Sequence, residues 1–236
     1  MKLESFIIKP LSFIVAIFLF PFFIFHGLFI ILKSATIKST TKFLIHMFFI
    51  SGIIVFHEYG HFIAAECSGM TPPGFSLGFG PVLIHKNING TDYRLSAIPL
   101  GGYTELDDKK MANIPQINKF FIASAGVTFN LILALPLFLL GGLGIKKSFK
   151  AILEDLYMNM LSLQSNFSQK AKDKIATSGL TSMHIFSSEY VTMANGWQAI
   201  PRFLASFSVG LAFFNYLPIP GLDGWHALMA ILYNSF

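Results

Sequence analysis

Long apolar stretches alternate with shorter polar segments along this chain of 236 residues. A helix needs about 20 apolar residues to cross roughly 30 Å of hydrocarbon, and each stretch is that long or nearly so. The pattern therefore predicts an α-helical polytopic membrane protein with about four transmembrane helices. We expect these helices in residues 11–32, 43–66, 120–145 and within 203–233.

The first stretch, residues 11–32, follows Lys2 and Lys9 as the core of a signal peptide would. It is longer than the usual core of about 7–15 residues, and no small-x-small cleavage site follows it. We therefore expect an extra N-terminal span that is retained.

Residues 74–105 have the pattern of strands. Two β-forming runs, 81–85 and 93–97, flank the dipeptide Asn89-Gly90. Asn-Gly in this position is a strong signal for a type I′ turn, whose two central residues both have positive φ. The pattern predicts a β-hairpin over residues 74–105.

Residues 147–176 alternate apolar and polar side chains at helical spacing, and the segment ends in lysines. A helix with one apolar face and basic residues lies in the membrane interface rather than across the bilayer. We expect such an amphipathic helix here. Its apolar positions include Ile152, Leu156, Met160 and Leu163.

The composition is that of a membrane protein. The chain is 53% hydrophobic and 12% charged, with 27 phenylalanines, which is too apolar for a soluble globular domain. The net charge of +5 comes mostly from lysines beside the apolar stretches, which favours contact with the bilayer surface over nucleic-acid binding. The single cysteine, Cys67, allows no internal disulfide, and we expect it to be a small buried apolar residue.

A polar pentapeptide, H-E-Y-G-H at residues 57–61, lies inside the second predicted span. Positions four apart share one face of a helix, so His57 and His61 can offer imidazole nitrogens to one metal ion. Glu58 projects about 100° around the helix from His57 and is placed to hold a water instead. A bound Zn²⁺ lowers the pKa of its water to about 7, and an adjacent carboxylate can take the remaining proton. This chemistry is amide hydrolysis.

The third metal ligand must come from elsewhere, and the last predicted span offers Asp223. This acid follows Asn-Tyr-Leu-Pro-Ile-Pro-Gly-Leu, which begins at Asn215. A carboxylate at membrane depth is costly and by default functional, and the metal is its obvious partner. The alternative is an aspartate at a helix end that faces interfacial water. The prolines and glycines around Asp223 should break the helix, which is tolerated only where protein or a watery cavity receives the backbone.

These two motifs resemble the hallmarks of the site-2 protease family of intramembrane zinc metalloproteases, which are H-E-x-x-H and a distant L-D-G. Other segments resemble the bacterial RseP-type branch, and all the blocks occur in the expected order between residues 53 and 228. These segments are G-F-G-P at 78–81, R-L-S-A-I-P-L-G-G-Y at 94–103, and Ala125-Gly126 followed by Asn130.

The resemblance implies that His57, His61 and Asp223 bind one Zn²⁺ per chain and that Glu58 is the catalytic base. It also implies a membrane-associated hairpin that dips in beside the zinc. Such a hairpin can hold an extended substrate by main-chain pairing, and an ordinary surface hairpin is the alternative.

Asn130 follows Ala125-Gly126, and Asn215 begins the segment that leads to Asp223. The family resemblance suggests that such asparagines donate hydrogen bonds to the substrate backbone. Packing between helices is the alternative role for both.

The chain departs from the RseP-type pattern in three places, the smallest of which is Val127, where the family has the proline of A-G-P. RseP-type proteases have PDZ domains between the second and third core helices, but here residues 146–201 leave too little room for one. We therefore expect a single membrane-embedded metalloprotease domain over residues 1–236. The L-D-G segment is followed by Trp225, where the family usually has a small residue, and this side chain either narrows the site or packs on lipid.

We therefore expect a multi-pass zinc metalloendopeptidase of the bacterial inner membrane. By resemblance, its substrates would be transmembrane proteins or remnant signal peptides in the lipid bilayer. A zinc transporter of the ZIP type also has H-E-x-x-H in a membrane helix, but it needs more helices and more intramembrane ligands. A non-catalytic relative is the other alternative, although Glu58 and all three ligands are present.

Overall fold

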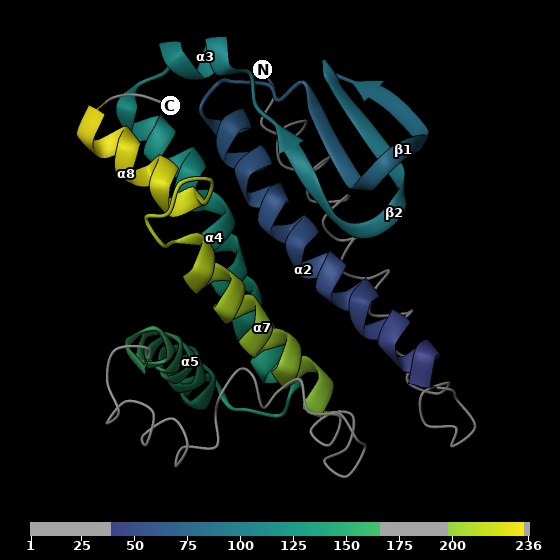
Figure 1. Cartoon of the computed structure of the whole chain (residues 1–236), viewed down its shortest axis with the longest axis vertical. Coiled ribbons are helices and arrows are strands. Elements are labelled where there is room, and N and C mark those ends of the chain that lie inside the picture. The colour runs from purple at the N-terminus through teal and green to yellow at the C-terminus, as the bar shows by residue number, and fades with distance from the viewer. Residues whose placement is uncertain (1–38, 166–197, 234–236) are drawn as a thin grey trace. The chain divides into compact units, whose positions relative to one another are not determined.

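The computed structural model describes residues 39–165 and 198–233 (Figure 1). The chain divides into two compact units, Met1–Ile45 and His46–Phe236. The predicted span at 11–32 lies outside the described residues, as does the 166–176 part of the predicted amphipathic segment. The elements in chain order are α2 (Ser39–Cys67), β1 (Gly74–Ile88), β2 (Thr91–Glu105), α3 (Asp108–Asn113), α4 (Gln116–Leu140), α5 (Ile145–Ser165), α7 (Ala199–Asn215) and α8 (Asp223–Tyr233).

Helix α2 contains the H-E-x-x-H motif and ends in a tight turn. Gly69 has a φ of +78°, and its N–H donates to the carbonyl of Glu66 at 3.0 Å. The N–H of Met70 donates to the carbonyl of Ala65 at 3.0 Å, and the two side chains belong to one buried cluster. This is a Schellman motif with its usual hydrophobic contact. It turns the chain sharply, so that the hairpin folds back beside the helix.

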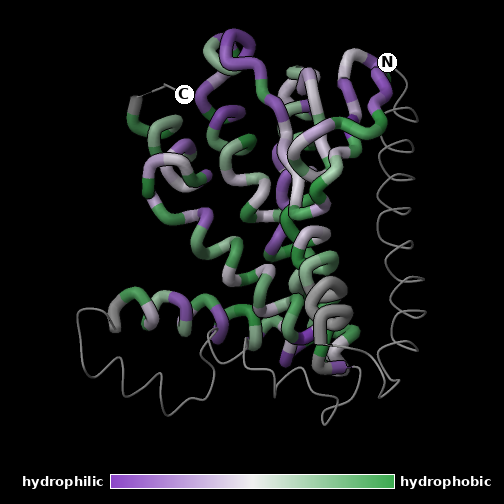
Figure 2. The backbone as a smooth tube through the Cα atoms, turned by 45° about the vertical axis from the view of Figure 1, so that its right-hand side comes forward, coloured by the Kyte–Doolittle hydropathy of each residue, from purple (hydrophilic) through white to green (hydrophobic). Residues whose placement is uncertain are grey.

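Two described helices are long and apolar enough to cross a membrane, Met47–Cys67 and Gln116–Leu140. A third apolar helix, Ile200–Asn215, is shorter. Hydrophobic residues predominate along these helices in Figure 2. A mostly helical fold with candidate spans and one hairpin is therefore confirmed, while the full count of four spans stays a prediction.

The predicted hairpin is present, and its turn has the expected geometry. Strands β1 and β2 pair in antiparallel fashion, with Ile88 opposite Thr91. The residues between them, Asn89 and Gly90, have φ values of 55° and 92°. Both values are positive, as a type I′ turn requires.

Both strands curl, so that the beginning of β1 is paired on two sides. Residues 74–77 pair with 92–95 in the same direction and with 102–105 in the opposite direction. Arg94 links these segments because its guanidinium donates to Asp92 at 2.8 Å and also to Glu105. The end of β2 thereby becomes an edge of the curled sheet, and this edge lies against α2.

Helix α4 ends at Leu140 rather than at the predicted residue 145, because two glycines follow it. Gly142 has a φ of +80°, and the N–H of Leu143 donates a hydrogen bond of 3.1 Å to the carbonyl of Phe138. Helix α5 then runs crosswise to α4 and α7 at one end of the bundle, opposite the hairpin and α3 (Figures 1 and 2). Its inner face packs against α4 and α7 through Ile152 and Leu156.

The last predicted span, 203–233, is divided by an irregular segment, as its prolines and glycines predicted. Helix α7 ends at Asn215, and α8 begins at Asp223. Gly221 in the connection has a φ of +94°. Helix α4 packs against both α7 and α8, which places the break beside the middle of the bundle.

The expectation of a buried Cys67 was wrong, because the side chain is exposed. Cys67 is the last residue of α2 and lies two positions, or about 200°, around the helix from Ala65. Ala65 is fully buried against Met70, Met111 and Ile122. Cys67 therefore faces away from this cluster.

Candidate metal centre

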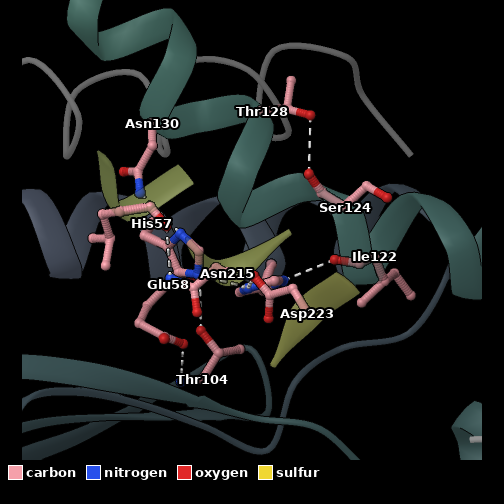
Figure 3. A network of polar contacts seen from close by, with 11 residues as sticks. His57, Glu58, Thr104, Ile122, Ser124, Thr128, Asn130, Asn215 and Asp223 are labelled. Atoms are coloured by element: carbon pink, nitrogen blue, oxygen red, sulfur yellow. Dashed lines mark hydrogen bonds and ion pairs between the residues drawn. The ribbon is translucent and has the colours of Figure 1, made fainter. Parts of the chain in front are cut away.

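Three ligand atoms from distant parts of the sequence meet at one point (Figure 3). Nε2 of His57 lies 3.3 Å from Nε2 of His61, and Oδ2 of Asp223 lies 3.0 Å and 3.3 Å from these two nitrogens. Tetrahedral zinc with bonds of about 2.0–2.1 Å would hold neighbouring ligand atoms roughly 3.3 Å apart. Among the described residues, this is the one group of His, Cys, Asp and Glu side chains that could hold a metal ion.

The contacts of Asp223 also fit a shared cation. Its Oδ2 atom is buried and has no hydrogen-bond partner in the described part of the chain, although both imidazoles are near. A buried carboxylate oxygen without a donor is costly unless a cation takes the donor's place. Two histidines and one carboxylate are an ordinary catalytic zinc set, so the residues present fit the ion.

The backbone of α4 determines which nitrogen of His61 carries the proton. Nδ1 of His61 lies 2.7 Å from the carbonyl oxygen of Ile122. A carbonyl can only accept, so Nδ1–H is the donor and Nε2 keeps its lone pair. The imidazole is thereby fixed in the tautomer that binds a metal through Nε2.

Two glycines allow α2 and α4 to approach at this point. A Cβ atom on Gly126 would lie 2.5 Å from Nε2 of both His57 and His61, which is where a metal ion would bind. A Cβ atom on Gly60 would lie 2.7 Å from the carbonyl oxygen of Ala125. The metal-binding space therefore exists because these positions have no side chain.

Asp223 is positioned by the irregular segment before it. It is the first residue of α8 and follows a tight turn in which Gly221 has a φ of +94° and the N–H of Leu222 donates to the carbonyl of Ile219 at 3.0 Å. A Cβ atom on Gly224 would collide with the carbonyl oxygens of Tyr216 and Leu217. The glycine of L-D-G thus lets the segment 216–222 fold tightly against the start of α8.

Glu58 is held apart from the three ligand atoms. Its Oε2 atom accepts a hydrogen bond of 3.1 Å from the backbone N–H of Thr104 on β2. Its backbone carbonyl accepts a second bond of 2.7 Å from the Thr104 hydroxyl. The carboxylate therefore points toward the hairpin edge, next to the histidines but not between them.

The structure brings the predicted ligands and base together and places the two asparagines nearby. Asn130 is completely buried on α4, and its amide lies 3.0 Å from Nδ1 of His57. Asn215 is the last residue of α7, and its amide nitrogen donates to the carbonyl of Leu211 at 3.1 Å. The substrate-binding roles of both residues stay predictions.

Sequence reasoning missed three groups around the centre. Gly126 belongs to a segment that carried the family resemblance, so its glycine was a usable signal. The carbonyl of Ile122 and the N–H of Thr104 are backbone groups, and no residue type marks them in a sequence.

Comparison with known proteins gives a consistent assignment. The model of Peptidase family M50 matches residues 43–235 of the chain. A protein of Campylobacter jejuni, named provisionally as a zinc metalloprotease, is 41% identical over a region that covers 45% of this chain and 33% of that protein. The chloroplast membrane metalloprotease ARASP of Arabidopsis thaliana is 32% identical over 43% of this chain and 26% of its own length.

A third relative, from Treponema pallidum and also named provisionally as a zinc metalloprotease, is 36% identical over 35% of this chain and 22% of that protein. The matched regions thus span a third or less of the length of these curated relatives.

Proposed function

Because the chain belongs to peptidase family M50, the site-2 protease family, we propose that it is an intramembrane zinc endopeptidase. It hydrolyses peptide bonds within or near the transmembrane segments of membrane proteins. The observation that carries this proposal is the triangle of His57, His61 and Asp223 ligand atoms, 3.0–3.3 Å apart, with Glu58 beside it. One Zn²⁺ per chain fits this triangle.

Bound zinc supplies a water of lowered pKa and polarises the scissile carbonyl. The protein's own residues supply the rest. Glu58 lies on the next position of the helix after His57, and Thr104 anchors only its Oε2 atom. Oε1 is then the atom that orients the attacking water, accepts its proton and returns that proton to the leaving amine.

The hairpin is suited to present the substrate. A helical transmembrane segment hides its carbonyls in its own hydrogen bonds, so it must be extended before it is cut. Thr104 brings the sheet next to Glu58, and a strand edge of this sheet that is not packed against α2 can hold an extended peptide by main-chain pairing. We assign Asn215 to the same task because it is the last residue of α7, directly before the segment that leads to Asp223, and lies near the centre (Figure 3).

The exposed apolar residues support a position within the membrane. The helices α2, α4 and the α7–α8 pair, together with the apolar stretch at 11–32, make four spans of a multi-pass protein in the bacterial inner membrane. Helix α5 exposes a stripe of large apolar side chains along its outer face and lies in the membrane interface. The stripe consists of Ile145, Phe149, Leu153, Tyr157 and Met160.

The substrates we propose are single-span membrane proteins and signal-peptide remnants. Both present a short apolar helix that can enter the bundle laterally from the lipid. The interval between α4 and α7 is the place where RseP-type proteases carry PDZ domains. Its described part is the single helix α5, so we propose that substrates reach the centre without a PDZ gate.

A transporter requires further ligands along a pathway through the membrane. Among the described residues, His57, His61 and Asp223 form one isolated group. Glu58 is also anchored through Thr104 in the position of a base, which a non-catalytic relative would not need. These observations favour hydrolysis over both alternatives.

The proposal is tested by separating metal binding from cleavage. Glu58→Gln in the full chain should keep about one zinc per chain, because Glu58 is not a ligand, and should abolish cleavage. His57→Ala should lose both. Elemental analysis measures zinc, and mass spectrometry of membrane peptides that accumulate in cells with the Glu58→Gln chain reports cleavage. Undiminished proteolysis by the Glu58→Gln chain would remove the enzyme assignment.

A further inference from the structure

The buried amide of Asn130 has an unusual set of contacts. The side chain is completely buried, and its Nδ2 atom lies 3.0 Å from Nδ1 of His57. Its Oδ1 atom is also buried and has no hydrogen-bond partner in the described part of the chain. A buried amide oxygen left without a donor destabilises the folded state.

The protonation of His57 resolves this arrangement. A neutral imidazole that offers Nε2 to a metal carries its proton on Nδ1. Nδ1–H of His57 would then face the NH₂ group of Asn130, and two donors would meet at 3.0 Å. The two ends of an amide have nearly the same shape, so their orientation is decided by their partners. A half-turn of the amide places Oδ1 opposite Nδ1–H and satisfies the imidazole and the orphaned oxygen together.

We propose that Asn130 is a positioning residue of the metal centre: its amide oxygen accepts the hydrogen bond from Nδ1–H of His57 and holds the ring with Nε2 toward the metal. This inference rests on the proposed zinc site. It gives Asn130 a role behind a ligand rather than on the substrate, since the side chain has no exposed surface.

The spacing along α4 supports this role. Ile122, Gly126 and Asn130 are each four residues apart and therefore lie on one face of the helix. The carbonyl of Ile122 accepts from Nδ1–H of His61, and Asn130 stands in the equivalent position for His57. Gly126 between them leaves room for both Nε2 atoms. This face of α4 thus provides one acceptor behind each imidazole and a gap in front of both.

Asn130 is itself held by the neighbouring helix. The buried hydroxyl of Ser208 on α7 donates to the backbone carbonyl of Asn130 at 2.8 Å. This bond joins α7 to α4 at the level of His57. The bond does not involve the Asn130 side chain, which therefore remains available to the His57 imidazole.

Zinc affinity of the full chain in detergent, measured by competition with a chromogenic chelator, tests the proposal. Asn130→Ala removes the acceptor and should weaken zinc binding about 10–100-fold, as loss of a partner behind a ligand does. Asn130→Asp keeps an oxygen in place and should stay within a few-fold of the wild-type chain. The matched control is Asn159→Ala, which removes a buried asparagine from α5 instead of α4. This control should not change the zinc affinity.

A second readout needs no metal and no activity. Nitrogen NMR of histidine-labelled, zinc-free protein in an Asp223→Ala background, which removes the carboxylate 3.0 Å from Nε2 of His57 as a competing acceptor, should show the Nδ1–H tautomer with Asn130 and with Asn130→Asp. A mixture of tautomers is expected for Asn130→Ala. Equal zinc affinities in all the chains, equal losses in Asn130→Ala and Asn130→Asp, or an Nε2–H tautomer in the Asp223→Ala chain that keeps Asn130 would each overturn the proposal. A wild-type chain that binds no zinc would refute the proposed function, and the tautomer measurement would still decide the role of Asn130.

Discussion

The backbone N–H of Thr104 donates to Oε2 of Glu58 across 3.1 Å, so the edge of the hairpin holds the carboxylate of the H-E-x-x-H helix. Thr104 is paired with Phe75 in the sheet, but its N–H points to α2 and takes no part in that pairing. The group that we propose as the catalytic base is therefore held between two elements that are far apart in the sequence.

This relationship predicts different effects for two substitutions of Thr104. Thr104→Pro removes the N–H without removing a bond of the β-ladder, so Glu58 loses its anchor. We expect zinc content to be unchanged and the cleavage rate to fall roughly tenfold or more, because a misplaced base loses part of its contribution. Thr104→Val keeps the N–H and should retain most of the activity. Equal rates for the two variants would show that the N–H does not position the base.

Gly126 should tolerate no side chain. In Gly126→Ala the new methyl carbon would lie 2.5 Å from Nε2 of both His57 and His61, in the space where the metal binds. We expect the purified variant to contain little zinc. Gly52→Ala is the matched control on α2, because a Cβ atom there has no neighbour within 4 Å. The control should keep its zinc and gain up to about 1 kcal/mol of stability from the higher helix propensity of alanine.

Asp155 on α5 should make stability depend on pH. Burial raises the pKa of its carboxyl above the ordinary value of 3.8, although Ser206 of α7 donates a hydrogen bond to it. The folded state therefore binds the proton more tightly than the unfolded state, and stability falls as pH rises from 3.8 through the raised pKa. Above the raised pKa the buried carboxyl is fully ionised, and its destabilising effect no longer increases with pH.

Asp155→Asn should consequently stabilise the chain at pH 7 by about 1 kcal/mol, because its buried Oδ2 has no partner among the described residues. The gain should shrink as the pH is lowered to 4, because the raised pKa of Asp155 increases its protonated fraction there. Thermal unfolding in detergent at the two pH values measures the difference. The exposed neighbour Glu154 provides the control, since Glu154→Gln should shift stability by a few tenths of a kcal/mol at most. A gain from Asp155→Asn that is the same at both pH values would contradict the assignment.

The proposed topology predicts opposite membrane faces for the hairpin and α5. The hairpin turn follows the C-terminal end of α2, whereas α5 begins after the far end of α4 (Figure 1). Cysteines at the exposed positions Lys86 and Lys146 should therefore react with a membrane-impermeant thiol reagent from opposite sides. The background is Cys67→Ser, which removes the exposed native thiol. Labelling of both positions from one side would exclude the four-span arrangement.

The sequence by itself determined the features that depend on short spacing. His57 and His61 share a helix face because they are four residues apart, and Glu58 follows from the same periodicity. Asn89-Gly90 specified its turn because few residues adopt positive φ at two adjacent positions. The break before Asp223 followed from prolines that cannot continue a helix.

Only the tertiary structure decided how these pieces meet. The anchor of Glu58 on Thr104, the bond from His61 to the carbonyl of Ile122 and the place of Asn130 behind His57 all join different elements. Apolar patterning predicts that a helix is buried but not which residue of a neighbouring element it touches. The residue type alone gave the wrong burial for Cys67, whose side chain faces outward. The two histidine contacts depend on where α2 and α4 cross, and Gly60 and Gly126 allow the two helices to approach closely there.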